Sequence, residues 1–132
     1  MVGCERTEKN MKVQSYKELN VWTKGIEITD AVYSLTEKFP RKEMFGLGNQ
    51  MEKAATSIPS NVAEGFMRQS TKEFIQYLHI SLGSSAEFET QLIIAFKRRY
   101  VESPVFEVLQ KEIEAEGRML RGLIKSLKDR LR

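Results

Sequence analysis

The stretch Ser57-Ile58-Pro59-Ser60-Asn61-Val62-Ala63-Glu64-Gly65 lies inside a long apolar periodic segment and decides how the chain can fold. Apolar residues around it recur every three or four positions, as on one face of a helix: Met44, Leu47, Met51, Ala55, Ile58, Val62 and Phe66. Pro59 removes the hydrogen bond to the Ala55 carbonyl, but the apolar spacing resumes at Val62. The sequence therefore predicts a helix over residues 42–67 that is kinked at Pro59 and continues beyond it.

Three further segments carry the same helical spacing. Ser15-Tyr16-Lys17-Glu18 has the pattern of a capping box, which opens a helix that ends near residue 38, before Phe39-Pro40. A second capping box over residues 70–73 opens a helix to about residue 99, and Ser103-Pro104 opens the last one. Because the connections are short and no strand pattern competes, the sequence predicts an all-α, up-and-down antiparallel four-helix bundle.

Length and composition limit how many domains the chain can form and indicate the cellular compartment in which it works. A chain of 132 residues with 41% hydrophobic and 30% charged residues is typical of one globular domain. Its polar start lacks periodicity, so we expect a mobile arm over residues 1–14 and the bundle over residues 15–132. No apolar run approaches the roughly twenty residues that span a bilayer, and no hydrophobic signal core opens the chain. We therefore expect a cytoplasmic protein without a membrane partner.

The helix predicted over residues 15–38 carries more apolar surface than one core can bury. One arc of its helical wheel contains Val21, Ile28, Val32, Leu35 and Phe39, and an adjoining arc contains Leu19, Trp22, Ile26 and Tyr33. Ile80 and Ile94 likewise point away from the apolar stripe of the helix over residues 70–99. Since uncovered apolar surface of this kind marks interfaces, we expect a homo-oligomer.

Few residues offer catalytic or metal-binding chemistry. Cys4 lies in a polar segment with nothing arranged to activate it, which predicts an inert thiol. His79 falls on the outer side of its helix, where a solvated or interface histidine is expected rather than a ligand or general base. Nucleotide-binding loops and nucleophile motifs are missing from the sequence. The sequence therefore predicts a protein that is not an enzyme and that needs no metal and no cofactor.

A polar strip flanks the apolar face beside Pro59. It consists of Ser57, Asn61, Glu64 and Arg68. The strip could contact a partner or ligand, but we favour a structural role, in which it satisfies the carbonyl freed by Pro59 and caps a seam between two helices. Antiparallel pairing about residue 69 places Ile58 opposite Ser81, so Gly65 and Ser85 are expected to permit close helix packing.

The end of the last helix carries a basic row, and it is the candidate nucleic-acid site: Arg118, Arg121, Lys125, Lys128 and Arg132. From Arg118 onward only Asp129 is acidic, against six basic residues once Arg130 is counted. The row extends roughly 20 Å and can follow several phosphates, although a solvated polar face is the alternative. Aromatic residues are not interleaved with it, so no sequence preference can be predicted.

These patterns resemble a known family, the bacterial four-helix bundle proteins also called 23S rRNA intervening-sequence proteins, over about residues 16–127. The stretch over residues 57–65 is the most specific part of the resemblance. It is accompanied by Leu19-Asn20-Val21-Trp22, Phe39-Pro40, Glu43, Gly46-Leu47, Gln50, Gly83-Ser84 and Glu87. We expect the family motif to be structural or to form an interface through Ser57, Pro59, Asn61, Glu64, Gly65, Gly83, Ser84 and Glu87.

The resemblance implies a ring-like homopentamer without established catalytic residues. It agrees with the two apolar arcs described above, and the name of the family suggests a connection with RNA. The chain is also similar to accessory proteins of diversity-generating retroelements, which are basic pentameric bundles that bind nucleic acid and a reverse transcriptase.

Two functions from different classes remain open at this point. In the first, the oligomer binds RNA or DNA backbones through the basic row with little sequence preference. In the second, it is an adaptor that binds another protein through apolar grooves between protomers. The salt dependence of the binding affinity distinguishes the two functions. Affinity for nucleic acid falls as salt rises, because phosphate contacts release counterions, whereas the affinity of an apolar interface hardly changes.

Overall fold

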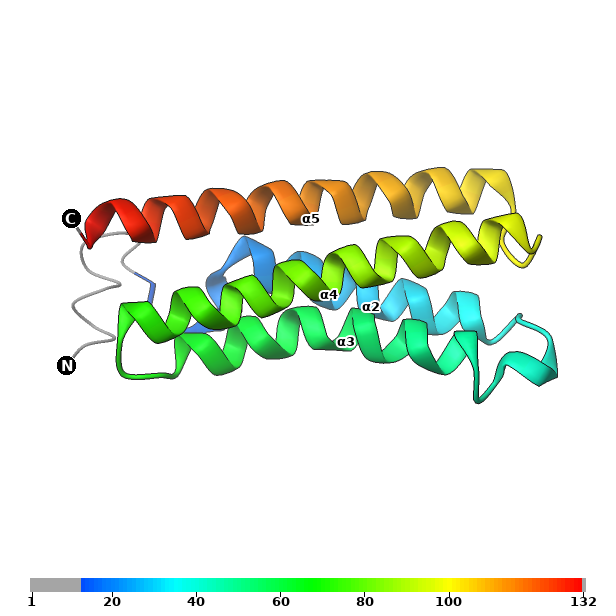
Figure 1. The fold of residues 1–132 in the computed structure, drawn as a ribbon, viewed down its shortest axis with the longest axis horizontal. Helices are drawn as coiled ribbons and strands as arrows, with labels where there is room; N and C mark the ends of the chain where they lie inside the picture. The colour runs from blue at the N-terminus through cyan, green and yellow to red at the C-terminus, as the bar shows by residue number, and fades with distance from the viewer. Residues whose placement is uncertain (1–12, 132) are drawn as a thin grey trace.

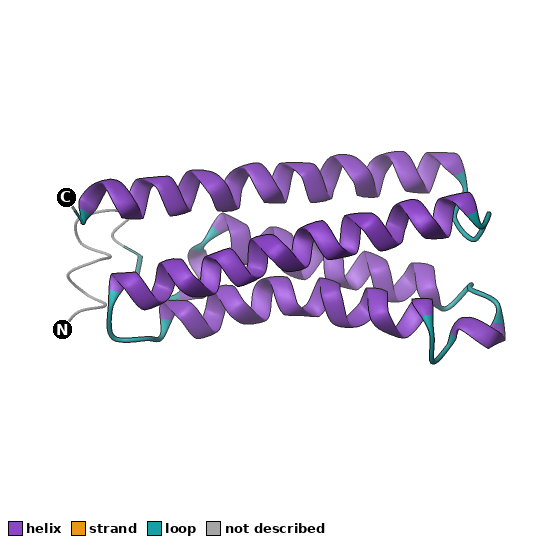
Figure 2. Ribbon diagram, in the orientation of Figure 1, coloured by secondary structure: helices purple, strands orange, loops and turns teal. Residues whose placement is uncertain are grey.

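The computed structural model describes residues 13–131, and this part of the chain folds into four long helices (Figure 1). The helices are α2 (Asn20–Thr36), α3 (Leu47–Phe66), α4 (Thr71–Lys97) and α5 (Ser103–Arg130), and two short 3-10 helices, η1 (Tyr16–Glu18) and η2 (Arg41–Glu43), precede α2 and α3. Figure 2 shows helices and loops, and the described residues form no strand. The prediction of an all-α protein with four helices is confirmed.

Consecutive helices run in opposite directions and lie side by side (Figure 1). Each helix packs against the next one in the chain, and α2 also packs against α5, so that every helix has two neighbours. The apolar faces meet in one core, whose largest fully buried side chains include Phe74, Phe88, Met51, Ile58 and Leu120.

The first helix begins later than the sequence predicts. The Ser15 hydroxyl accepts the N–H of Lys17 at 3.1 Å and closes only the short η1, so the predicted capping box does not open α2. Leu19 is extended, with φ −78° and ψ 130°, and this conformation places its side chain in the core at 4% exposure. Burial of Leu19 therefore interrupts the helix, which restarts at Asn20.

The predicted arm over residues 1–14 falls largely outside the described residues. Its last two positions are described and are held by the folded protein. Val13 is buried in the core, and the Gln14 N–H donates to Glu18 Oε2 at 3.3 Å.

The second helix also begins later than predicted, at Leu47 and not at residue 42. Glu43 explains the difference, because its Oε1 accepts the N–H of Leu47 at 3.1 Å and thereby caps the first turn of α3. Its Oε2 accepts the Tyr100 hydroxyl at 3.0 Å, and these two hydrogen bonds lower the pKa of Glu43. A Cβ at Gly46 would lie 2.9 Å from Glu43 Oε1, so glycine leaves room for the cap.

Ser70 caps α4 as predicted, whereas Glu73 accepts the Ser70 hydroxyl and completes no reciprocal bond to the Ser70 backbone N–H. The Ser70 hydroxyl accepts the N–H of Glu73 at 3.1 Å and lies 3.1 Å from Glu73 Oε1. The last helix starts one position earlier than its predicted cap implies, with Glu102 at the cap and Ser103 as the first helical residue.

Candidate nucleic-acid interface

Pro59 lies inside α3, and neighbouring helices satisfy the backbone around it. The Thr29 hydroxyl of α2 lies 3.1 Å from the Ala55 carbonyl, which is the group that loses its helical donor at Pro59. The Ser81 hydroxyl of α4 donates to the Ile58 carbonyl at 2.8 Å, as the predicted pairing requires. The prediction that the polar strip satisfies the Ala55 carbonyl is wrong, because the donor comes from α2 and the strip faces α4.

The polar strip joins α3 to α4. The hydroxyls of Ser57 and Ser84 lie 2.7 Å apart, and Asn61 Nδ2 donates to the Ser57 carbonyl at 2.8 Å and to the Ser57 hydroxyl at 2.9 Å. Glu64 is exposed and accepts the Tyr77 hydroxyl at 3.2 Å. These contacts give the family motif a role in helix pairing.

Further residues of the motif, together with the neighbouring Ser85, divide into a buried and an exposed group. A Cβ at Gly65 would lie 2.5 Å from the Cβ of Tyr77, so the close approach of α3 and α4 requires glycine there. Ser85 is buried, and its hydroxyl donates to the Leu82 carbonyl at 2.7 Å. Gly83 and Glu87 are exposed, and nothing lies within 4 Å of the position of a Cβ on Gly83. Gly83 is therefore not a packing residue within this chain.

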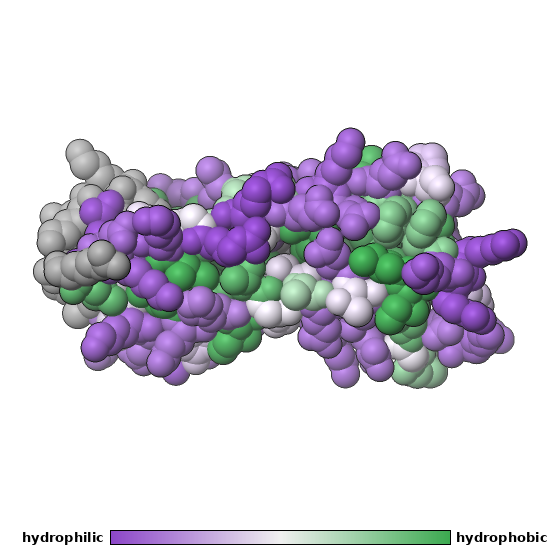
Figure 3. Space-filling view, turned by 45° about the horizontal axis from the view of Figure 1, so that its top comes forward, coloured by the Kyte–Doolittle hydropathy of each residue, from purple (hydrophilic) through white to green (hydrophobic). Residues whose placement is uncertain are grey.

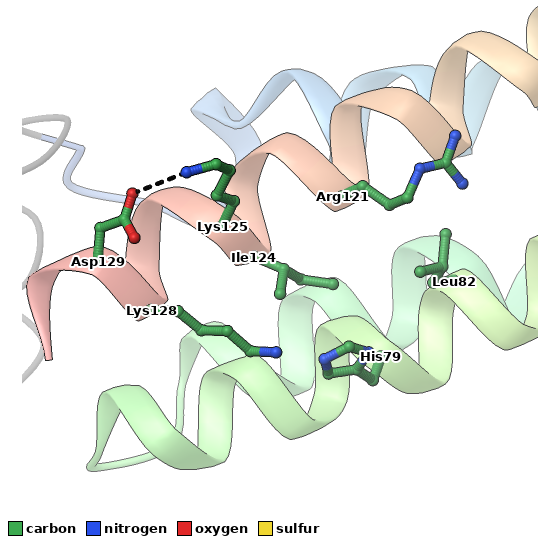
Figure 4. A pocket seen from close by; sticks show the side chains of 7 residues that line it. All are labelled: His79, Leu82, Arg121, Ile124, Lys125, Lys128 and Asp129. Carbon is green, nitrogen blue, oxygen red and sulfur yellow. Dashed lines mark hydrogen bonds and ion pairs between the residues drawn. The ribbon is translucent and has the colours of Figure 1, made fainter.

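A groove between α4 and α5 follows the basic row (Figure 4). It has a volume of about 440 Å³ and is lined by His79, Leu82, Arg121, Ile124, Lys125, Lys128 and Asp129. An adjoining hollow of about 310 Å³ shares Leu82 and Arg121 and also includes Arg118. The structure thus brings three of the five predicted row residues to the groove and Arg118 to the adjoining hollow, while Arg132 lies outside the described residues.

The charged side chains spread along the rim of the groove. In Figure 4, Lys128 and His79 point toward one another across it, and Lys125 turns to Asp129, whose Oδ2 lies 3.2 Å from Lys125 Nζ. Arg121 extends along α5 in the opposite direction, and its Nη1 lies 3.6 Å from the position of a Cβ on Gly117.

Cations dominate one end of the groove. Within residues 13–131 no carboxylate forms an ion pair with Arg121 or Lys128, and Lys125 has one such partner in Asp129. The adjoining hollow is mixed, because Glu89 and Glu114 line it together with the two arginines. At the end bounded by His79 and Lys128, the ammonium of Lys128 thus has no carboxylate partner among the described residues.

His79 is a residue of the groove that sequence reasoning missed. The sequence places it correctly on the outer side of its helix, but an outer position does not reveal which neighbouring helix lies beside it. Packing of α4 against α5 brings the imidazole beside Lys128 and next to the apolar side chains of Leu82 and Ile124. The sequence did contain one signal for this placement. His79 and Leu82 are three residues apart, so their side chains lie on the same side of one helix.

Two kinds of site receive no support from the described part of the chain. Its His, Cys, Asp and Glu side chains include no group of three that could hold a metal ion. None of the described helices is long and apolar enough to cross a membrane.

The fold and the groove define a class, an all-α protein of four antiparallel helices with a cation-rich groove between the last two. The chain belongs to the 23S rRNA-intervening sequence protein family, whose model matches residues 17–122. The predicted resemblance is thereby confirmed.

A solved structure shares this fold. It is a crystal structure of a protein of unknown function from the S23 ribosomal protein family of Bacteroides thetaiotaomicron, which matches with a TM-score of 0.74 and 24% identity. The match covers 80% of this chain and 95% of the other. No curated protein matches the chain.

Proposed function

We propose that the chain forms a non-enzymatic oligomeric up-and-down four-helix bundle that binds RNA or DNA backbones through the basic row of α5. The observation that carries the proposal is the gathering of exposed cations on the rim of one groove, among them Arg121 and Lys128, which have no carboxylate partner within the described residues. From Arg118 to Lys128 the row spans roughly 15 Å of helix. That length matches about four phosphates along one strand of a duplex.

Low sequence preference is expected of such a site. Lysine and arginine contacts to phosphates fix the position of a protein on a nucleic acid but do not identify the bases. The four described residues of the row are all exposed, and they belong to one helix face that lies at the surface of the protein. Binding by this row should therefore follow backbone charge and depend on salt.

The oligomer, a ring-like homopentamer in this proposal, is supported by apolar side chains at the surface. Figure 3 shows hydrophobic residues among the hydrophilic ones on one face of the molecule. Ile26 and Tyr33 of α2 are 42% and 47% exposed, and Ile80 and Ile94 of α4 are 50% and 45% exposed. A ring would repeat the groove in each protomer, so that weak phosphate contacts add up on one nucleic acid.

The proposed bundle includes a bend of α3 at Pro59. Support comes from the Ala55 carbonyl, which lies within hydrogen-bond distance of the Thr29 hydroxyl and has no N–H to accept from residue 59. A helix commonly bends where proline interrupts its backbone hydrogen bonds, so we expect the bend at this position.

The proposed function is tested by replacing Arg121, Lys125 and Lys128 with glutamine. We expect weaker binding of generic RNA, with a salt slope that flattens by roughly one unit for each phosphate that the variant no longer binds. Glutamine keeps the tendency to form a helix, so the fold should be retained. The matched control replaces Lys38, Arg41 and Lys42, which are exposed and outside the groove, and removes the same charge.

Equal weakening in the two triple variants would show that net charge, and not the row, binds RNA. If the parent protein bound no RNA at any salt concentration, the proposed function would be wrong. A protein partner captured in a salt-insensitive manner would then favour the adaptor function.

A further inference from the structure

We propose that the groove between α4 and α5 binds single-stranded nucleic acid, with one base held against His79, Leu82 and Ile124 while the flanking phosphates contact the basic row. The inference rests on the proposed function and adds the form of nucleic acid that the site takes. It arises from a juxtaposition that only the fold creates, an apolar groove floor beneath a cationic rim.

The floor of the groove is apolar and hollowed. Contact with a duplex backbone needs exposed cations and no hollow, whereas this row borders a groove of about 440 Å³. That volume falls in the range of about 300–1,000 Å³ found for pockets that hold small organic ligands. Leu82 is half-buried and Ile124 is buried at 5% exposure, and both side chains lie between the two helices (Figure 4). An apolar hollow of this size suits the flat ring of a base.

His79 supplies an aromatic surface at the edge of the hollow. Unpaired bases stack on aromatic side chains, histidine among them, and such stacking tolerates any base because every base has a π-face. The imidazole is exposed on the α4 side of the groove, opposite the cations of α5. A base on this floor could therefore contact the ring of His79 and the aliphatic side chains together.

Cations stand on both sides of the hollow. Arg121 lies on one side of Ile124 along α5, and Lys125 and Lys128 lie on the other (Figure 4). A strand that lays one base on the floor can thus place a phosphate before it and a phosphate after it near positive charge. Glu89 and Glu114 line the adjoining hollow and should direct the strand out of the groove at that end.

A single strand fits these features better than a duplex. Bases of a duplex are stacked inside it, and a protein that needs one of them must first extract it at a cost in unstacking. Bases of a single strand are available without that cost, and recognition of RNA commonly uses unpaired bases for this reason.

The experiment compares three probes of equal length on the parent protein: a single strand with all its bases, a single strand of abasic nucleotides and a duplex. The two single strands carry the same backbone charge, so phosphate contacts alone would bind them equally. We expect the abasic strand to bind at least about five-fold more weakly, which is the lower end of the effect of one stacked base. The duplex should also bind more weakly than the complete single strand.

Two variants assign the difference to the groove. His79→Ala should bind the complete strand more weakly and bring it close to the abasic strand, whereas His79→Phe should keep the difference. Gln76→Ala is the control, because Gln76 is exposed on the same helix and does not line the groove. Circular dichroism of each variant would establish that its helices are intact.

The outcomes separate the two proposals. Equal, salt-dependent binding of complete and abasic strands would overturn the base site and leave backbone binding by the row in place. Failure of every strand to bind would overturn the proposed function as well. Polyglutamate, an acidic polypeptide, serves as a competitor. If it displaced the bound RNA more strongly than a matched single strand does, the groove would bind acidic protein segments and the inference would be overturned.

Discussion

At the scale of single residues, Glu116 of α5 stands apart because it is an acid in the core. It is 0% exposed, and neither carboxylate oxygen has a hydrogen-bond partner among the described residues. Burial raises its pKa to about 8, and Lys24 opposes this rise. The ammonium of Lys24 itself pairs with Glu112 at 3.1 Å. Glu116 is therefore mostly protonated in the folded protein at neutral pH.

The raised pKa of Glu116 links folding to pH. Below the ordinary pKa of 4.5 the folded and unfolded chains both hold the proton, so the contribution of Glu116 to stability is fully present. Between 4.5 and about 8 the unfolded chain releases the proton and the folded chain keeps it. The free energy of unfolding must therefore fall as the pH rises through this window, and it levels off above about 8.

We predict that Glu116→Gln removes this loss of stability. Glutamine resembles the protonated acid in shape and cannot ionise, so the variant should match the parent near the acid end of the window. It should exceed the parent above pH 8 by an amount on the order of a few kcal/mol. Thermal unfolding across the pH range measures the difference, with the exposed Glu114→Gln as the control. Parallel pH profiles of parent and Glu116→Gln would contradict the prediction.

At the scale of the helices, the contact of α2 with α3 at Pro59 is closely fitted. A Cβ added to Gly25 would lie 3.2 Å from the Cβ and Cδ atoms of Pro59. The same turn of α2 presents the Thr29 hydroxyl, which lies 2.8 Å from the Gly25 carbonyl and 3.1 Å from the Ala55 carbonyl. Glycine and threonine together let α2 pack on the proline and bond the carbonyl that the proline leaves free.

We predict that Thr29→Val lowers the free energy of unfolding by about 1–3 kcal/mol, because the valine keeps the shape and leaves the Ala55 carbonyl without its donor. Thr56→Val is the matched control. The Thr56 hydroxyl also donates within its own helix, to the Glu52 carbonyl at 2.7 Å, but that side chain is exposed. Urea denaturation of both variants gives the comparison, and equal destabilisation would mean that the bond to Ala55 contributes nothing.

Much of the element structure could be predicted from the sequence, because apolar spacing and breakers determine where helices form. The two late starts were missed for different reasons. At Leu19, burial of the side chain overrides the predicted capping box. At Glu43, a carboxylate that also accepts the Tyr100 hydroxyl caps the helix at Leu47, which the apolar spacing used for the prediction does not reveal. Likewise the basic row could be read from α5 alone, whereas the groove depends on how α4 packs against it. Thr29 as the partner of Pro59 does not follow from periodicity. Glu116 does lie at the spacing of the apolar stripe, between Ile113 and Leu120, but acidic side chains are rarely buried and so its burial was not expected.

At the scale of the whole molecule, exposed apolar side chains occur on more than one side. Ile26 and Tyr33 lie on α2 and Ile80 and Ile94 on α4, whereas Val108 of α5 is 62% exposed. An oligomer that buries the first two pairs would leave the groove of α4 and α5 open only if its interfaces avoid the basic row. For the proposed oligomer we therefore expect substitutions in these apolar pairs to change the oligomeric state and leave the basic row intact.

We predict that light scattering gives a mass five times the 15.3 kDa of the chain. Replacing Ile80 and Ile94 with glutamate should reduce this mass, since the charges would be buried without partners at an interface. Glutamate at Thr56, which is exposed on α3, is the control for added charge. A mass near 15.3 kDa for the parent at micromolar concentration would rule out the oligomer.

The order of the helices also governs when the groove comes into existence. Each helix packs on the one before it, so α2, α3 and α4 can associate in succession through short connections as the chain lengthens. The groove has no second wall until α5 docks, and the same event encloses Glu116. During synthesis, then, a nascent chain that still lacks α5 has neither the groove nor the basic row that borders it.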